Sequence, residues 1–306
     1  MIVDMRKLLK IAGVAALLLL VYSLFQMLFT ALATGGYLIY AIVTGSSLPE
    51  VPGNIELALD NPLFAGFKTN TMAVGLFLSA AAMLLFIHLT KLFRLRWSLL
   101  RSIEAKPLFY STVLVFTSMF AVNIFVQWFT LDNILENEFV GLSHTLLGAF
   151  TISLLAPLLE EVMFRGAIEG YMLRNLRSPW LAIVVSALIF GVFHMNPVQI
   201  VYATLLGIVF GWMYYRTGSL MSVIVGHVLN NTIATLMTLA IGTESETELL
   251  RNYVPQETAV GIEIAAFLFF TILSVYMVMK IHWSLPPVPN PWHESDEQAG
   301  NAEVSL

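Results

Sequence analysis

Eight long apolar segments follow one another along this chain, and they constrain its fold more than any other feature. A helix needs about 20 apolar residues to cross a lipid bilayer. The expected spans cover residues 11–34, 71–92, 107–131, 148–173, 180–196, 198–215, 219–241 and 259–281. Their nearly continuous apolarity, without the alternation of a membrane β-strand, favours helices. The sequence therefore predicts an all-α, polytopic membrane bundle of about eight transmembrane helices.

The composition agrees with a membrane protein and excludes several kinds of partner. Of the 306 residues, 58% are hydrophobic and 11% are charged, whereas a soluble domain carries roughly 25% charged residues. A net charge of -5 does not indicate nucleic-acid binding, and there is no P-loop for a nucleotide. We expect a multi-pass protein of the cell membrane, with the lipid bilayer around it, and the short loops are typical of a bacterial inner membrane.

Basic residues in alternate loops predict the orientation. They precede the first span and follow the second, fourth, sixth and eighth: Arg6, Lys7, Lys10, Lys91, Arg94, Arg96, Arg101, Lys106, Arg174, Arg177, Arg216 and Lys280. The intervening loops are mostly acidic. Because basic loops stay in the cytoplasm, both termini are expected there. The polar, proline-rich residues 284–306 are predicted to form a disordered cytoplasmic tail.

Two adjacent glutamates lie inside the fourth span, where ionisable groups are costly and mark functional sites. They are Glu160 and Glu161, and Arg165 follows four residues after Glu161. That spacing puts Glu161 and Arg165 on one helix face, where they can pair. Glu160 points about 100° away from Glu161, so it is available as a general base toward a cavity. The alternative is a buried charge network that only fixes helix packing.

Later apolar segments contribute two histidines and an asparagine. His194 ends the run Phe190-Gly191-Val192-Phe193-His194, and His227 precedes Asn231 by four residues on one helix face. At about 1.5 Å of rise per residue, Glu160 and His194 each lie about 21 Å from the cytoplasmic ends of their spans. They can therefore meet. Asn231 can support an oxyanion, although each residue alone is more typical of helix packing.

Missing motifs narrow the chemistry. The chain has no cysteine, which excludes a catalytic cysteine and thiolate metal sites. It also lacks the H-E-x-x-H and G-x-S-x-G motifs. Its four aspartates lie outside or at the edges of the expected spans, which excludes an intramembrane aspartate dyad. The catalytic chemistry that remains is the activation of a water by glutamate and histidine.

The pattern Glu160-Glu161-x-x-x-Arg165, then Phe190-x-x-x-His194, then His227-x-x-x-Asn231 resembles the three-motif signature of the CAAX protease and bacteriocin-processing family. That family includes the Ras-converting CAAX prenyl endopeptidase. The resemblance covers about residues 145–240. It implies an eight-helix intramembrane endopeptidase with a membrane-associated peptide or protein as substrate. The expected division is N-terminal helices in 1–140, a catalytic core in 141–283 and the tail in 284–306.

The resemblance also implies roles for these residues. Glu160 activates the water, and His194 holds or polarises it. His227 and Asn231 stabilise the oxyanion or complete a metal site, while Glu161, Arg165 and Phe190 support the geometry. Glu160, His194 and His227 are the ligand types of a zinc site with an open water position. A metal-free reaction uses the same residues, and both mechanisms stay open.

Two other functions are compatible with the same residues. A non-catalytic membrane protein of this fold, such as an immunity factor or scaffold, would keep the helices without using the motifs. A proton-coupled transporter would use Glu160 and His194 as a proton relay. The intact motifs argue against the non-catalytic protein, and the lack of a convincing internal repeat weakens the transporter without excluding it.

Overall fold

The computed structural model describes residues 5–45, 62–90, 104–242 and 246–285. Within these ranges the chain is helical and contains no strand, so the predicted all-α membrane bundle is confirmed. The elements are α1 (Met5–Thr44), α3 (Pro62–Thr90), α4 (Ala105–Gln127), α5 (Glu136–Ser143), α6 (Leu146–Phe150), η2 (Thr151–Leu155), α7 (Ala156–Glu161), η3 (Val162–Glu169), α8 (Gly170–Asn175), α9 (Pro179–Phe193), α10 (Pro197–Thr217), α11 (Leu220–Ile241), α12 (Glu246–Tyr253) and α13 (Gln256–Ser284).

Seven of the described helical stretches are long and apolar enough to cross a membrane. The fifth expected span, 180–196, corresponds to α9, which has 15 residues. At 1.5 Å per residue α9 is about 22 Å long, which is less than the roughly 30 Å of a bilayer core. α9 is shorter than expected because Pro197 begins the next helix, and the turn between them contains Met195 in a left-handed conformation (φ 49°). The chain turns back at His194 instead of continuing across.

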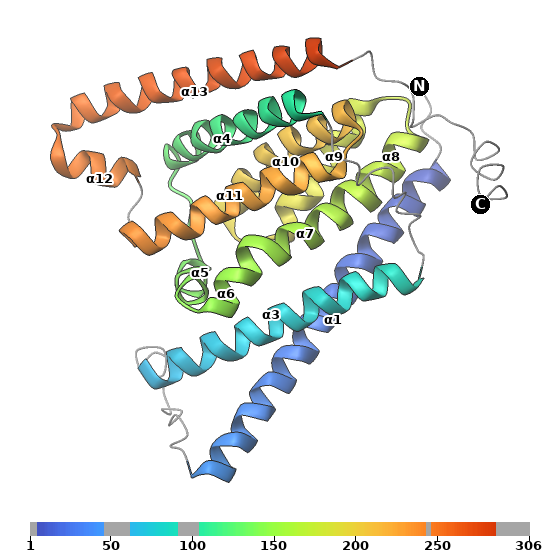
Figure 1. Ribbon diagram of the computed structural model, residues 1–306, viewed down its shortest axis with the longest axis vertical. Helices are drawn as coiled ribbons and strands as arrows, with labels where there is room; N and C mark the ends of the chain where they lie inside the picture. The colour runs from blue at the N-terminus through green and yellow to red at the C-terminus, as the bar shows by residue number, and fades with distance from the viewer. Residues whose placement is uncertain (1–4, 46–61, 91–103, 243–245, 286–306) are drawn as a thin grey trace.

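In Figure 1, α1 begins and α13 ends at the same end of the bundle. This arrangement is what both termini on one side of the membrane require. The expected tail begins at residue 284, the last residue of α13, and residues 286–306 lie outside the described ranges. The basic residues between 91 and 101 lie outside them too. The cytoplasmic orientation therefore stays a prediction from the loop charges.

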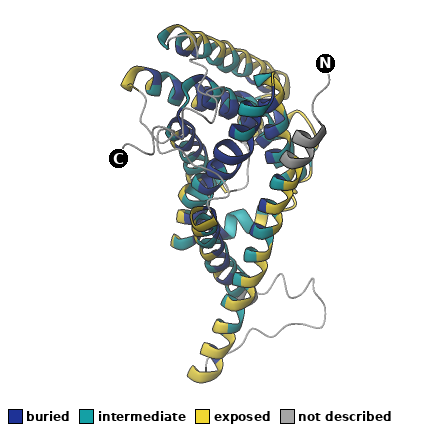
Figure 2. Cartoon of the chain, turned by 90° about the vertical axis from the view of Figure 1, so that its right-hand side faces the viewer, coloured by how far each residue is buried: buried dark blue, intermediate teal, exposed yellow. Residues whose placement is uncertain are grey.

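The most buried part of the bundle surrounds α7 and η3. Residues 161–170 are all buried, and they pack against α9, α10 and α11. By contrast, α1 and α13 carry many exposed apolar side chains. Figure 2 shows exposed positions in yellow along the narrow lower end of the molecule and along its outermost helix. Apolar side chains of this kind are suited to contact with lipid. The backbone of a helix can lie in lipid as well, because it satisfies its own hydrogen bonds. The interior around α7 is therefore the place for polar chemistry.

The fourth expected span is one continuous helical stretch with two π-helical segments. η2 and η3 flank α7, whose last two residues are Glu160 and Glu161. π-helical turns widen a helix and occur frequently at functional sites.

Close contact between α9 and α10 depends on glycine. A Cβ at Gly191 would lie 2.0 Å from Thr204 Oγ1 and 2.6 Å from the backbone oxygen of Ile200. Only glycine allows this approach, which brings the end of α9 and its His194 against α10.

Candidate active site

Glu161 and Arg165 form the ion pair that their spacing predicts. Arg165 Nη1 donates to Glu161 Oε1 at 2.9 Å, and neither side chain is exposed. Arg165 Nη2 donates to the backbone oxygen of Gly207 on α10 at 3.3 Å. The guanidinium also lies 4.4 Å from the ring centre of Phe190 on α9. Arg165 thus connects η3 to two neighbouring helices, and a buried charge needs such partners.

His227 on α11 lies between the two glutamates. Its Nδ1 lies 2.7 Å from Glu161 Oε1, and its Nε2 lies 3.7 Å from Glu160 Oε2. A carboxylate only accepts hydrogen bonds, so the neutral ring carries its hydrogen on Nδ1 and presents a lone pair on Nε2. The distance to Glu160 is too long for a direct hydrogen bond and is suited to a water that contacts both atoms. Glu161 therefore orients His227, whereas Glu160 takes no part in the ion pair with Arg165.

His194 is the first residue after α9, and its ring is fixed by the turn before it. Nδ1 lies 2.9 Å from the backbone oxygen of Phe190. Because a carbonyl accepts, this hydrogen bond also leaves Nε2 as the acceptor of a neutral ring. Phe190 packs edge-on against both imidazoles, with ring centres 4.9 Å from His194 and 5.8 Å from His227. Phe190 therefore positions both histidines.

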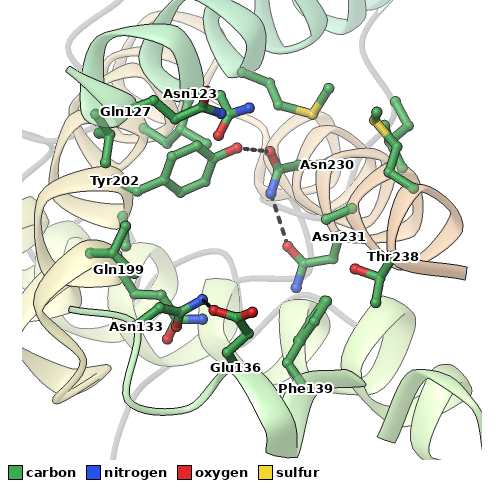
Figure 3. Close-up of a pocket in the computed structure, with 18 of the residues that line it drawn as sticks. Asn123, Gln127, Asn133, Glu136, Phe139, Gln199, Tyr202, Asn230, Asn231 and Thr238 are labelled. Carbon is green, nitrogen blue, oxygen red and sulfur yellow. Dashed lines mark hydrogen bonds between the residues drawn. The ribbon is translucent and has the colours of Figure 1, made fainter. Parts of the chain in front are cut away.

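Asn231 is held by a chain of hydrogen bonds that crosses three elements (Figure 3). The Tyr202 hydroxyl donates to Asn230 Oδ1 at 2.9 Å, and Asn230 Nδ2 donates to Asn231 Oδ1 at 3.0 Å. Asn231 Nδ2 donates to the backbone oxygen of Ile152 at 2.9 Å, inside the π-helical segment η2. The amide nitrogen of Asn231 carries two hydrogens. One is donated to Ile152 and orients the amide, and the second can be donated to another group.

A cavity of about 560 Å³ connects these groups. Its lining includes Phe190, His194, His227, Asn230 and Asn231 but neither glutamate. The Glu160 side chain is only 15% exposed, and its Oε2 lies 3.7 Å from Nε2 of His227, which lines the cavity. Such a volume lies within the roughly 300–1,000 Å³ of ligand pockets.

The arrangement differs from the expectation in one respect. From the sequence, His194 is the partner of Glu160, but the imidazole that comes within 4 Å of a Glu160 oxygen in the described chain is that of His227. The expected sequence pattern gave no role to Tyr202, which holds Asn230. No sequence signal could have indicated it, because that hydrogen bond joins residues 28 positions apart on different helices.

The three candidate zinc ligands do not form one cluster in the described part of the chain. Two histidine Nε2 lone pairs and a carboxylate are the right donor types for zinc. However, the described part of the chain contains no group of three His, Cys, Asp or Glu side chains that could hold a metal ion. The side chains as arranged therefore do not fit a three-ligand zinc site.

Comparison with known proteins identifies the region that holds the site. Residues 142–233 match the family Rce1-like, described as type II CAAX prenyl endopeptidase Rce1-like. Over 106 residues the chain is 30% identical to the protein of Bacillus subtilis (strain 168) named "Putative membrane peptidase YdiL". That alignment covers 35% of this chain and 40% of the relative. No solved structure matches the chain significantly.

The matched region begins within α5 and ends within α11, and it contains Glu160, Glu161, Arg165, His194, His227 and Asn231. The helices on either side of it, α1 to α4 and α12 to α13, lie outside the family match. Residues 142–233 of this multi-pass membrane protein are therefore similar to the Rce1-like family of CAAX prenyl endopeptidases, and part of the chain is similar to a putative membrane peptidase.

Proposed function

We propose that the protein is an intramembrane endopeptidase of the CAAX prenyl protease type. It hydrolyses a peptide bond in a membrane-associated protein or peptide, with a water that Glu160 activates. One observation carries the proposal: His227 lines the cavity, donates from Nδ1 to Glu161 and presents Nε2 3.7 Å from Glu160. A carboxylate that orients a histidine beside a second, proton-accepting carboxylate is an arrangement suited to general-base catalysis.

In the proposed reaction, a water sits between Glu160 Oε2 and His227 Nε2. Glu160 takes one of its protons while His227 Nε2 accepts the other hydrogen as a hydrogen bond. The water oxygen bonds to the scissile carbonyl carbon, and the carbonyl oxygen becomes an oxyanion. The second Nδ2 hydrogen of Asn231 donates to that oxyanion, a type of contact that stabilises tetrahedral intermediates.

The intermediate collapses when the carbon–nitrogen bond breaks. Glu160 then returns the proton to the departing nitrogen, so the carboxylate is regenerated and one water is consumed. His194 lines the same cavity with Nε2 as an acceptor. In the proposed complex it accepts a hydrogen bond from a peptide N–H and aligns the chain for attack.

The function can be tested by mapping protein termini in native membranes. Membranes containing the wild-type chain are expected to accumulate new carboxyl and amino termini that are absent with Glu160→Gln. Glu169→Gln is the matched control, because Glu169 is a fully buried glutamate nine residues later in the same helical stretch. Identical termini in all three membranes would contradict peptidase activity and favour a scaffold or transporter.

Metal removal gives an independent prediction. Because the described residues form no three-ligand cluster, no proposed step runs through a metal. Treatment of the pure protein with a chelator, followed by dialysis, is expected to leave its cleavage rate unchanged. A rate that falls and is restored specifically by zinc would show that Glu160, His194 and His227 move together around an ion.

A further inference from the structure

The cavity that holds the two histidines leads to one end of the bundle. Its deep wall contains His227, which is buried, whereas Asn133, Gly242 and Arg251 line it at exposed positions. These three lie after α4, at the end of α11 and in α12. The turn between α9 and α10 is at this end too, because Asn196 hydrogen-bonds to Asn133 and to the backbone of Ile134. The cavity mouth is therefore at the end where α4 and α11 finish.

The opposite end of the bundle is basic. Arg216, near the end of α10, donates to the backbone oxygens of His282 and Leu285 at the end of α13, so these helices finish side by side. The basic residues described at this end are Lys106, Arg174, Arg177, Arg216 and Lys280. By the rule that basic loops remain in the cytoplasm, this is the cytoplasmic end.

The mouth end has two described basic residues, and a glutamate pairs with each. Lys68 pairs with Glu138, and Arg251 donates to both oxygens of Glu263 at 2.9 and 3.0 Å. The hydrogen bond from Lys68 holds the pKa of Glu138, in the short helix α5, below its usual range. Glu138 is therefore ionised at neutral pH, and it keeps this end of the bundle from being basic.

Carboxamides dominate the polar lining of the cavity (Figure 3). Six of them line it: Asn123, Gln127, Asn133, Gln199, Asn230 and Asn231. A carboxamide offers both donors and an acceptor, which matches the N–H and C=O of a peptide backbone. The charged lining residues are Glu136 and Arg251, and Arg251 is already bound to Glu263.

A cavity wall rich in carboxamides is suited to bind the peptide groups of a substrate backbone rather than charged substrate side chains. It matches an extended chain, because the peptide groups of a helix are already satisfied internally. The apolar side chains between the carboxamides, such as Phe120, Phe129 and Phe139, suit uncharged substrate side chains.

We infer that the cavity receives an extended, largely uncharged polypeptide segment from the extracytoplasmic side. The substrates would then be exported or membrane-anchored chains that are cut outside the cytoplasm. This inference rests on the proposed peptidase function, and it specifies the face of the membrane and the conformation of the substrate.

The absence of cysteine from the chain allows a direct test of sidedness. Thr238→Cys places a thiol on the cavity wall, Asn133→Cys places one at the exposed rim, and Arg177→Cys places one at the opposite end. Intact cells are treated with a membrane-impermeant maleimide before or after permeabilisation. Asn133→Cys and Thr238→Cys are expected to react in intact cells, and Arg177→Cys only after permeabilisation. The wild-type chain gives no background.

The reverse pattern, with Arg177→Cys labelled in intact cells and Asn133→Cys protected, would overturn the inference. Labelling does not depend on cleavage, so this outcome is distinct from a failure of the peptidase function. If the rim reacts and the cavity thiol does not, the cavity does not open at this end, and the inference is also wrong.

A separate measurement tests whether the carboxamides bind the backbone of an extended substrate. It uses a peptide whose cleavage the terminus mapping reveals. Gln199→Leu is expected to raise KM about 2- to 10-fold with little change in kcat, since it removes one hydrogen bond that is made equally in the bound and transition states. An unchanged KM would show that this carboxamide does not bind the substrate. Thr238→Val, which removes a hydroxyl from the same wall, serves as the comparison variant.

Discussion

Glu160→Gln is expected to lower kcat by about 10²- to 10⁴-fold, the usual contribution of a general base. The amide keeps the size of the side chain but cannot accept a proton from water. Glu160 takes no part in the buried ion pair, which joins Glu161 to Arg165. The variant is therefore expected to fold and insert like the wild type, and its loss should appear in kcat rather than in the yield of monomeric protein.

The measurement is steady-state cleavage of one peptide by pure protein in lipid. Glu169→Gln is the control for replacing a glutamate in the same helical stretch, and it is expected to retain activity. Glu160→Asp separates position from charge: it retains the carboxylate but withdraws it by one methylene, so an intermediate rate is expected. A Glu160→Gln protein as active as Glu169→Gln would remove Glu160 from the reaction.

Arg165→Met is expected to destabilise the folded protein by about 3–5 kcal/mol, the typical cost of removing one member of a buried ion pair. The change leaves the Glu161 carboxylate fully buried beside His227 without its cation. It also removes the hydrogen bond to Gly207 and the contact with Phe190 that connect η3 to α10 and α9. Thermal unfolding in detergent, followed by size-exclusion chromatography, would show a lower midpoint and less monomeric protein.

A double variant distinguishes charge burial from loss of packing. Combining Arg165→Met with Glu161→Gln removes both buried charges, so much of the lost stability is expected to return. Activity is expected to stay low, because the ionised carboxylate that orients His227 is gone. If the double variant is no more stable than Arg165→Met alone, lost packing by Arg165 rather than the unpaired carboxylate explains the effect.

The features that the sequence predicted are local ones. The long apolar runs predicted about eight spans, of which seven are helices long and apolar enough to cross a membrane in the described chain, and the spacing of Glu161 and Arg165 predicted their ion pair. The helices α5 and α12 were not predicted, since each has eight residues and no long apolar run. The predicted span ended at residue 196, three residues beyond the observed end of α9 at Phe193, because an apolar run does not show where a chain turns.

The arrangement of the site depends on contacts that no local pattern encodes. His227 and Glu161 are 66 residues apart, and the packing of α11 against α7 brings them together. The π-helical segments likewise have no sequence signal here, yet η2 supplies the carbonyl that orients Asn231. As a result, the sequence could propose the residues of the candidate site but did not indicate that His227 comes within 4 Å of Glu160.

The most direct test of the account is hydrolysis in water enriched in oxygen-18 by the purified protein reconstituted in lipid. The substrate is a peptide identified from the membrane termini. We expect the new carboxyl terminus to carry oxygen from the solvent, at rates that are similar for the wild type and Glu169→Gln and that fall sharply for Glu160→Gln. Equal incorporation by Glu160→Gln, or no cleavage by the pure wild-type protein, would contradict the claim that Glu160 activates a water for peptide hydrolysis.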